Sequence, residues 1–433
     1  MEVRFCSLII ITAVIFLTSC ASSKYLTKKE SRNLDHILLE NPELSRHHLG
    51  FILKDVETGK VLKEVNSSKY FTPASNTKIL TLSAGLEILG DSIPSFEYYK
   101  QNDTLYVKGI GDPTFLHPDF VRQSSLNFLK TTGSVIVLDL SHFADQRYGA
   151  GWSWDDFNGA YQVERGALPL YGHVLRFTDY SVDIPYFQKS LDFKGDNGKM
   201  SIRRDRFQNV FNVSGEVGDS TKIAVPFIVT DSVTVGLLAD TLGKPVHLGK
   251  LDSSITTDIW FSHHVDSLYR PMIQESNNFY ADQILLMSGY RQFGTMRSKM
   301  VIDWMKSNVL NSPDELLWID GSGLSRYNLF TPRSMVHLLE RLRNKYGEDR
   351  ILNILPQGGV SGTIESWYSS DDGNPYIYAK TGTLRNNHSL SGFIRGDTGK
   401  LYVFSFMNNN FPGSSTTVKI PMQKILEFLK RSL

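Results

Sequence analysis

Two β-hairpin patterns lie near opposite ends of the chain, and this separation limits the folds that it can adopt. Residues 48–65 place apolar runs on either side of a Glu-Thr-Gly turn, and residues 390–406 do the same around an Asp-Thr-Gly-Lys turn. Such spacing around a glycine-containing turn is typical of paired antiparallel strands. Helical spacing flanks the hairpins at 31–39 and 422–433. We therefore expect an α/β (α+β) fold, in which the two chain ends build one antiparallel sheet with helices outside it.

The middle of the chain has a different pattern. Residues 95–250 are rich in short alternating strands, whereas helical spacing returns over 257–289, 296–309 and 333–346. A β-rich unit between two halves of one sheet is expected to be an insertion, and we expect it to hold two nested small domains. The expected division is a leader at 1–19, the first part of the main domain at 20–94, the inserted β-rich region at 95–250 and the second part of the main domain at 251–433.

Both cysteines, Cys6 and Cys20, lie in the first twenty residues. The apolar run from Phe5 to Leu17 is too short to span a bilayer and has the length of a signal-peptide core. Leu17-Thr18-Ser19-Cys20 resembles a bacterial lipobox, so we expect cleavage after residue 19 and acylation of Cys20, which would anchor a periplasmic protein to a membrane. No Asp follows Cys20, which favours the outer membrane of the cell envelope. The alternative is an ordinary secretory signal with an incidental cysteine.

Charge and cysteine usage exclude several classes of function. The chain has 46 Lys and Arg against 45 Asp and Glu, so it has no broad cationic field that could hold a nucleic acid. Without a cysteine beyond residue 20, the body can contain neither a disulfide framework, nor a Cys-ligated zinc, nor a Cys nucleophile. The pairs His47-His48 and His263-His264 have no further ligand at metal-binding spacing. We expect no metal and no organic cofactor.

A first motif, Ser75-Asn76-Thr77-Lys78, opens an apolar stretch that ends at Gly90. It places a hydroxyl and an amine at positions i and i+3, on the same side of a helical turn. Burial lowers the pKa of a lysine, and the neutral amine can then take the serine proton. The alternative is an ordinary first turn of a helix in which Lys78 reaches the surface.

A second motif, Lys380-Thr381-Gly382-Thr383, follows the strand-like residues 376–379. A cation, two hydroxyls and a residue without a side chain make a strand edge that can receive an extended ligand and hold its carboxylate. The alternative is a strand that ends in a glycine turn.

The third motif is Ser276-Asn277-Asn278, between the helical segments 268–273 and 279–286. A junction between two helices can point these side chains into a cleft. Ser and Asn are also common helix N-caps, which is the alternative.

Taken in chain order, Ser-x-x-Lys at 75–78, Ser-x-Asn at 276–278 and Lys-Thr-Gly at 380–382 are the motifs of penicillin-binding proteins and class A β-lactamases. The chain resembles the D-alanyl-D-alanine carboxypeptidase/endopeptidase family of low-molecular-mass penicillin-binding proteins, the peptidase S13 type related to the penicillin-binding protein 4 group. The resemblance covers nearly the whole chain beyond the leader, and includes residues 73–75, 111–114, 152–158, 320–326 and 362–363. The long interval between Lys78 and Ser276 matches that family's habit of inserting domains there.

The resemblance implies a penicillin-binding-protein/β-lactamase-like transpeptidase domain. It implies a serine DD-peptidase, a carboxypeptidase or an endopeptidase, that hydrolyses peptidoglycan stem peptides and is inhibited by β-lactams. It also implies an oxyanion hole made by the backbone N–H groups of Ser75 and Thr383. The implied site residues are Ser75 as the acylated nucleophile, Lys78 as its base, Ser276 and Asn278 as proton relay and peptide ligands, and Lys380, Thr381, Gly382 and Thr383 as the strand that binds the D-Ala carboxylate.

Two positions depart from the family pattern, since Asn277 and Ser361 stand where Asp is common in the family. Neither departure concerns the nucleophile, so we expect an effect on substrate preference only. Two alternatives stay open. A serine β-lactamase or esterase on the same scaffold is disfavoured because the chain has no Glu-x-x-Leu-Asn segment. A non-catalytic peptidoglycan-binding lipoprotein is disfavoured because such proteins usually lose the serine or the lysine.

Overall fold

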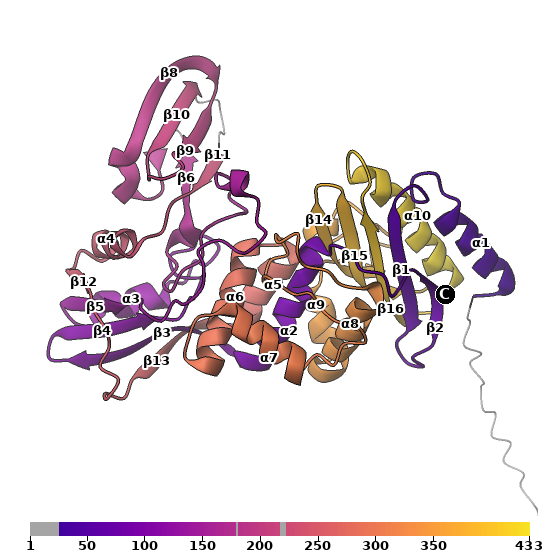
Figure 1. Ribbon diagram of the computed structural model, residues 1–433, viewed down its shortest axis with the longest axis horizontal. Coiled ribbons are helices and arrows are strands. Elements are labelled where there is room, and N and C mark those ends of the chain that lie inside the picture. Colours follow the sequence, from indigo (N-terminus) through magenta and orange to yellow (C-terminus); the bar gives the residue numbers. More distant parts are fainter. Residues whose placement is uncertain (1–25, 179–180, 217–221) are drawn as a thin grey trace, which may run out of the picture.

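The computed structural model describes residues 26–178, 181–216 and 222–433. Figure 1 shows a layer of helices between two larger sheets, with small sheets standing above one of them. Each larger sheet has five strands, and each small sheet has three. No helix in these residues is long and apolar enough to cross a membrane. Cys20 lies outside the described residues.

The first sheet is built from both ends of the chain, as the two hairpin patterns predicted. Its antiparallel strands follow the order β14 (Ile377–Leu384), β15 (Asn387–Arg395), β16 (Leu401–Asn409), β1 (His48–Asp55) and β2 (Val61–Val65). Strands β1 and β16 pair without interruption from His48 opposite Asn409 to Asp55 opposite Tyr402. The chain ends are therefore held together by backbone hydrogen bonds.

Two terminal helices cover the outer face of this sheet. Helix α1 (Lys28–Leu39) begins at a capping box between Thr27 and Glu30. Helix α10 (Thr416–Ser432) contacts α1, and both share one apolar cluster with strands β1, β14, β15 and β16. Helix α8 (Pro332–Tyr346) packs against β16 and β1 and belongs to a different cluster. The helices expected at 31–39, 333–346 and 422–433 are confirmed, and each begins before the expected residue.

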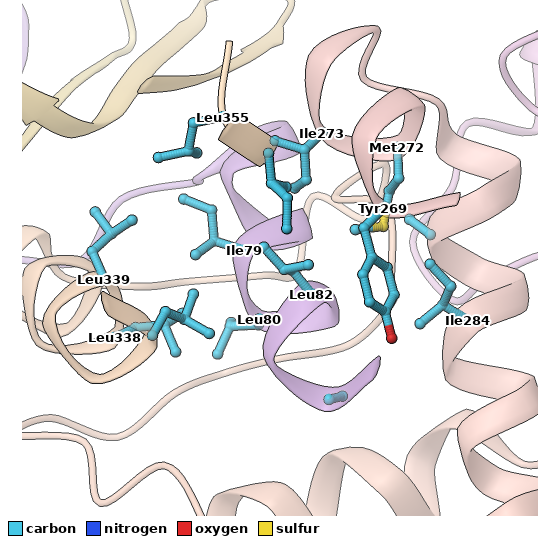
Figure 2. Close-up of a cluster of buried hydrophobic side chains, with 14 of the residues drawn as sticks. Ile79, Leu80, Leu82, Tyr269, Met272, Ile273, Ile284, Leu338, Leu339 and Leu355 are labelled. Atoms are coloured by element: carbon cyan, nitrogen blue, oxygen red, sulfur yellow. The ribbon is translucent and has the colours of Figure 1, made fainter. Parts of the chain in front are cut away.

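The helical layer surrounds α2 (Lys78–Ile88), whose first eight residues are all buried. An apolar helix without a polar face is stable only when other elements cover it on every side. Figure 2 shows Leu80 facing Leu338 on one side of α2, and Leu82 facing Tyr269 and Ile284 on the other. The remaining helices of the layer are α5 (Asp266–Gln274), α6 (Asn278–Phe293), α7 (Ser298–Asn308) and α9 (Glu348–Ile354). This packing forces Lys78, at the start of α2, into the interior.

The second larger sheet is mixed, in the order β12 (Val246–Leu248), β5 (Val135–Asp139), β4 (Thr104–Gly109), β3 (Ser92–Gln101) and β13 (Asp258–His264). The helix expected from residue 257 is wrong over its first turns, because residues 258–264 form strand β13 and pair with β3. The small sheets are β8 (Leu191–Lys199), β10 (Phe211–Glu216), β9 (Ser201–Arg204), and β11 (Lys222–Pro226), β6 (Val174–Thr178), β7 (Ser181–Val182). Helices α3 (Ser124–Thr131) and α4 (Asp231–Leu242) lie between these strands in the chain.

Candidate active site

Ser75 lies in a short 3-10 turn, Ala74–Thr77, that runs directly into α2. The preceding residue, Ala74, has φ +50°, a conformation that costs a non-glycine residue about 1 kcal/mol or more. Gly323 lies directly against this turn, and only a glycine fits there, because a β-carbon would lie 2.0 Å from the Ala74 carbonyl oxygen. The strained turn brings the Lys78 Nζ to 2.9 Å from the Ser75 Oγ, so the first motif forms a serine–lysine pair.

Lys78 is completely buried and has two other oxygen partners. Its Nζ is 2.6 Å from the Asn278 Oδ1 and 2.7 Å from the Ser322 carbonyl oxygen. Burial lowers the pKa of Lys78 to about 7, although the nearby carboxylates of Asp282 and Asp320 act in the opposite direction. A large fraction of the amine is therefore neutral at physiological pH. The alternative in which Lys78 reaches the surface is wrong.

Strand β14 lies against the Ser75 turn and carries the second motif. The motif lies inside the strand, which continues to Leu384, and not at a strand end. The close approach requires Gly382, because a β-carbon there would lie 2.2 Å from the Pro73 carbonyl oxygen. The Asn76 Nδ2 donates to the Lys380 carbonyl oxygen at 3.0 Å and joins the turn to the strand.

The Lys380 side chain is also fully buried. Its Nζ donates to the Ser276 Oγ at 2.9 Å and to the Thr381 carbonyl oxygen at 2.8 Å. Burial, assisted by the charge of Lys78, holds the pKa of Lys380 well below its usual value. An anion that enters beside Lys380 would raise this pKa again, because an opposite charge favours the charged form.

The third motif bridges the two lysines. Ser276, with φ +62°, occupies the junction between α5 and α6, and the Asn277 side chain caps α6 by accepting from the Tyr280 N–H. Ser276 contacts Lys380 and Asn278 contacts Lys78, so residues far apart in the sequence meet at one place. The Asn278 Nδ2 also donates to the Tyr161 carbonyl oxygen at 2.9 Å.

The threonines of β14 have partners of their own. The Thr381 Oγ1 lies 2.7 Å from the Thr363 Oγ1, and the Thr383 Oγ1 lies 2.8 Å from the His388 Nδ1. Burial lowers the pKa of His388 to about 3, so this imidazole is neutral at physiological pH. These contacts fix the orientation of both hydroxyls along the strand.

A cleft of about 570 Å³ opens above Ser75. Ten of the residues that line it belong to the three motifs or to the segments 152–158 and 320–326 that carry the family resemblance, whereas Tyr161, Gln162, Leu384 and Arg385 lie outside them. The lining residues are Ser75, Ser153, Asp155, Asp156, Tyr161, Gln162, Ser276, Asn278, Gly323, Leu324, Arg326, Thr383, Leu384 and Arg385.

Asp320 organises the loop that touches Lys78, a role that no motif in the sequence indicated. Its fully buried carboxylate accepts from the backbone N–H groups of Gly323 and Ser325, and from the side chains of Asn328 and Trp152, at 2.7–2.9 Å. These bonds hold the Ser322 carbonyl oxygen against Lys78. Three of these partners lie within eight residues of Asp320, and only Trp152 is distant in the chain.

Within the described residues, no group of three or more His, Cys, Asp or Glu side chains lies close enough to bind a metal ion.

A serine hydroxyl bonded to a buried lysine, beside an edge strand that carries a second buried lysine, defines a serine hydrolase of the serine–lysine class. The chain belongs to the D-Ala-D-Ala carboxypeptidase 3 (S13) family, whose model matches residues 30–183 and 260–430. The family expected from the motifs is thus confirmed, and the protein is a serine-type DD-peptidase.

Individual relatives agree with this assignment. The D-alanyl-D-alanine carboxypeptidase DacB of Haemophilus influenzae is 23% identical over 365 residues, which cover 73% of this chain and 75% of the relative. The D-alanyl-D-alanine carboxypeptidase of Actinomadura sp. (strain R39) is 25% identical over 438 residues, with 87% and 80% covered. The crystal structure of penicillin binding protein 4 from Haemophilus influenzae superposes with a TM-score of 0.71 at 22% identity, over 92% of this chain and 97% of that one. The expected fold class is confirmed.

Proposed function

We propose that the protein hydrolyses the terminal D-Ala-D-Ala bond of peptidoglycan stem peptides through an acyl-enzyme on Ser75, and that β-lactams acylate the same oxygen. One observation carries this proposal: the partners of the Lys78 Nζ. Two of the three, the Asn278 Oδ1 and the Ser322 carbonyl oxygen, can only accept hydrogen bonds. A neutral amine satisfies both with its two N–H groups and keeps its lone pair for the Ser75 hydroxyl.

In the acylation step Lys78 takes the proton of the Ser75 hydroxyl while the Oγ attacks the carbonyl carbon of the penultimate D-Ala. The negative charge that develops on the carbonyl oxygen is stabilised by the backbone N–H groups of Ser75 and Thr383. The tetrahedral intermediate then expels the terminal D-Ala, whose amine receives a proton relayed from Lys78 through Ser276.

The departing D-Ala carries a carboxylate, and β14 supplies its binding groups. Lys380 provides the charge, and the hydroxyls of Thr381 and Thr383 provide donors along the same strand. In the second half of the reaction, water transfers a proton to Lys78 and attacks the acyl carbon. The tetrahedral intermediate then expels the Ser75 Oγ, which takes the proton back from Lys78, so the serine hydroxyl and the neutral amine are both restored.

Intact mass after incubation with benzylpenicillin tests the proposal. The wild type should gain the mass of one penicilloyl group, and a Ser75→Ala variant should gain none. Consumption of benzylpenicillin without a lasting adduct would support the β-lactamase alternative. A folded wild type that neither gains mass nor consumes the drug, and releases no D-Ala from a D-Ala-D-Ala peptide, would support the non-catalytic binder.

The proposal includes a location in the bacterial cell envelope, with Cys20 acylated and the outer membrane favoured. Its support is the sequence around Cys20. A Cys20→Ser variant should leave the membrane fraction and lose incorporation of labelled palmitate, while its D-Ala release stays unchanged. Equal palmitate labelling of the variant would contradict the anchor.

A further inference from the structure

Four side chains from two distant segments form an exposed surface beside the cleft, which we name the aromatic shelf: Trp154, Phe157, Arg206 and Phe207. The Trp154 side chain is 68% exposed and the Phe207 side chain 81%. The Arg206 guanidinium carbon lies 4.5 Å from the ring centroid of Trp154, 5.6 Å from that of Phe207 and 6.0 Å from that of Phe157. The Arg206 guanidinium thus lies within cation–π distance of three aromatic rings.

The two segments of the shelf are fastened to each other below its surface. The Asn158 Oδ1 accepts from the Arg204 N–H at 2.8 Å, and the Asn158 Nδ2 donates to the Arg204 carbonyl oxygen. The buried Arg204 guanidinium lies 5.4 Å from the Phe157 ring and donates to the Pro226 carbonyl oxygen at 2.8 Å. The turn between β9 and β10 is therefore anchored to residues 153–158, so the two segments that carry the rings are joined before any ligand arrives.

The shelf adjoins the cleft along the chain. Trp154 lies between Ser153 and Asp155, which both line the cleft, and Trp154 begins the short 3-10 turn Trp154–Asp156. Packing within the chain does not explain two large rings exposed to this extent, and exposed apolar patches of this kind mark ligand surfaces. A ligand in the cleft can therefore extend onto the shelf.

We propose that the aromatic shelf binds sugar rings of the peptidoglycan glycan strand. This inference rests on the proposed function, because the stem peptide that enters the cleft is covalently attached to that strand. A pyranose ring has a face of C–H groups that packs on an aromatic ring, and the exposed Arg206 guanidinium supplies donors for hydroxyl and acetyl oxygens. The shelf thus selects the polymer, while the cleft selects the peptide end.

Binding to glycan strands from which the peptides have been removed tests the inference without any hydrolysis. The wild type should be retained on immobilised strands, and the Phe207→Ala and Trp154→Ala variants should be released early. A Phe193→Ala variant is the matched control, because Phe193 is 55% exposed on β8 of the same small sheet but lies outside the shelf. A wild type that is not retained, or shelf variants retained equally well, would overturn the inference whatever the D-Ala assay shows.

Release of D-Ala separates this inference from the proposed function. On a short free peptide that ends in D-Ala-D-Ala, all variants should match the wild type, and activity of the wild type tests the proposed function alone. On intact sacculi, KM should rise about fivefold or more for Phe207→Ala and Trp154→Ala, with kcat retained, as expected for loss of an aromatic contact. An equal loss on the free peptide would show that the rings only shape the cleft, and would also overturn the inference.

Discussion

At the Lys78 amine, the protonation state sets the rate of the first chemical step. Burial lowers the pKa of Lys78 to about 7, so the neutral base is scarce below this pH and dominant above it. The rate of acylation by benzylpenicillin should rise about tenfold per pH unit below the pKa and level off above it. Rapid mixing followed by intact mass gives this profile. A Lys78→Arg variant should be inactive throughout, because arginine stays charged, and a flat wild-type profile would contradict the role of Lys78.

The carboxylate of Asp282 also affects the protonation of Lys78. Burial and the neighbouring Asp320 raise the pKa of Asp282 to about 7, and its negative charge in turn favours protonated Lys78. An Asp282→Asn variant keeps an Oδ1 that can accept from the Gly321 N–H at 2.9 Å but loses the charge. The pKa of Lys78 should fall near and above pH 7, where Asp282 is charged, so the upper part of the rising limb should move to lower pH. At lower pH the two profiles should converge, because the wild-type Asp282 is then protonated and neutral as well.

The matched control for this prediction is Asp303→Asn, which removes an exposed carboxylate paired with Lys299 on α7. Its acylation profile should coincide with that of the wild type, because a surface pair is screened by solvent. A shift of the Asp282→Asn profile to higher pH would show that the sign of the interaction is wrong.

Among the elements, the contact between β14 and the Ser75 turn is sensitive to a small change. An added methyl in Gly382→Ala would lie 2.2 Å from the Pro73 carbonyl oxygen, so the strand and the turn must move apart. A displacement of about 1 Å between reacting groups can cost about 100-fold in rate, and we expect a loss of this size in benzylpenicillin acylation. Overpacking should also lower the free energy of unfolding by about 1–3 kcal/mol.

The control for this strand is Gly195→Ala on β8, where a β-carbon meets no atom within 4 Å. Its acylation rate and its unfolding midpoint should stay close to those of the wild type. If Gly382→Ala acylates as fast as this control, the close approach of β14 is not required for catalysis.

Elements with a strong local pattern were predictable from the sequence. The hairpins were visible because a glycine turn separates apolar runs, and α2 was visible because its apolar run is long. Strand β13 was missed, because Ile259, Trp260 and Phe261 form a short apolar run that fits a helix or a strand equally well. Its strand form depends on β3, which lies about 160 residues earlier in the chain and leaves no mark on the local pattern.

At the scale of the whole molecule, some site residues were predictable from the sequence and others were not. Ser75, Ser276 and Lys380 could be proposed because each belongs to a short motif. Asp282 and Asp320 could not, since their influence on Lys78 comes through burial and through distances that exist only after folding. Tyr161, Gln162, Leu384 and Arg385, which also line the cleft, belong to no motif and were missed for the same reason.

The stability of the whole molecule depends on the C-terminal helix α10, because this helix covers one face of the sheet that holds Lys380. Helix α10 and the last residue bury a row of apolar side chains against this sheet: Val418, Met422, Ile425, Leu426, Leu429 and Leu433. Truncating one such side chain typically costs about 2–5 kcal/mol, and a whole domain is stable by only about 5–15 kcal/mol. A chain that ends at residue 415 should therefore lose the fold and its benzylpenicillin adduct together.

A graded version of this experiment separates loss of stability from loss of chemistry. Leu429→Ala should lower the free energy of unfolding in urea by about 2–5 kcal/mol, yet acylate at the wild-type rate at a temperature where it stays folded. Lys424→Ala, on the exposed face of α10, should change stability by less than about 0.5 kcal/mol. Since α10 is far from Ser75 in the sequence and packs against the sheet that contains β14, normal acylation by the truncated chain would mean that β14 holds its position without the helix.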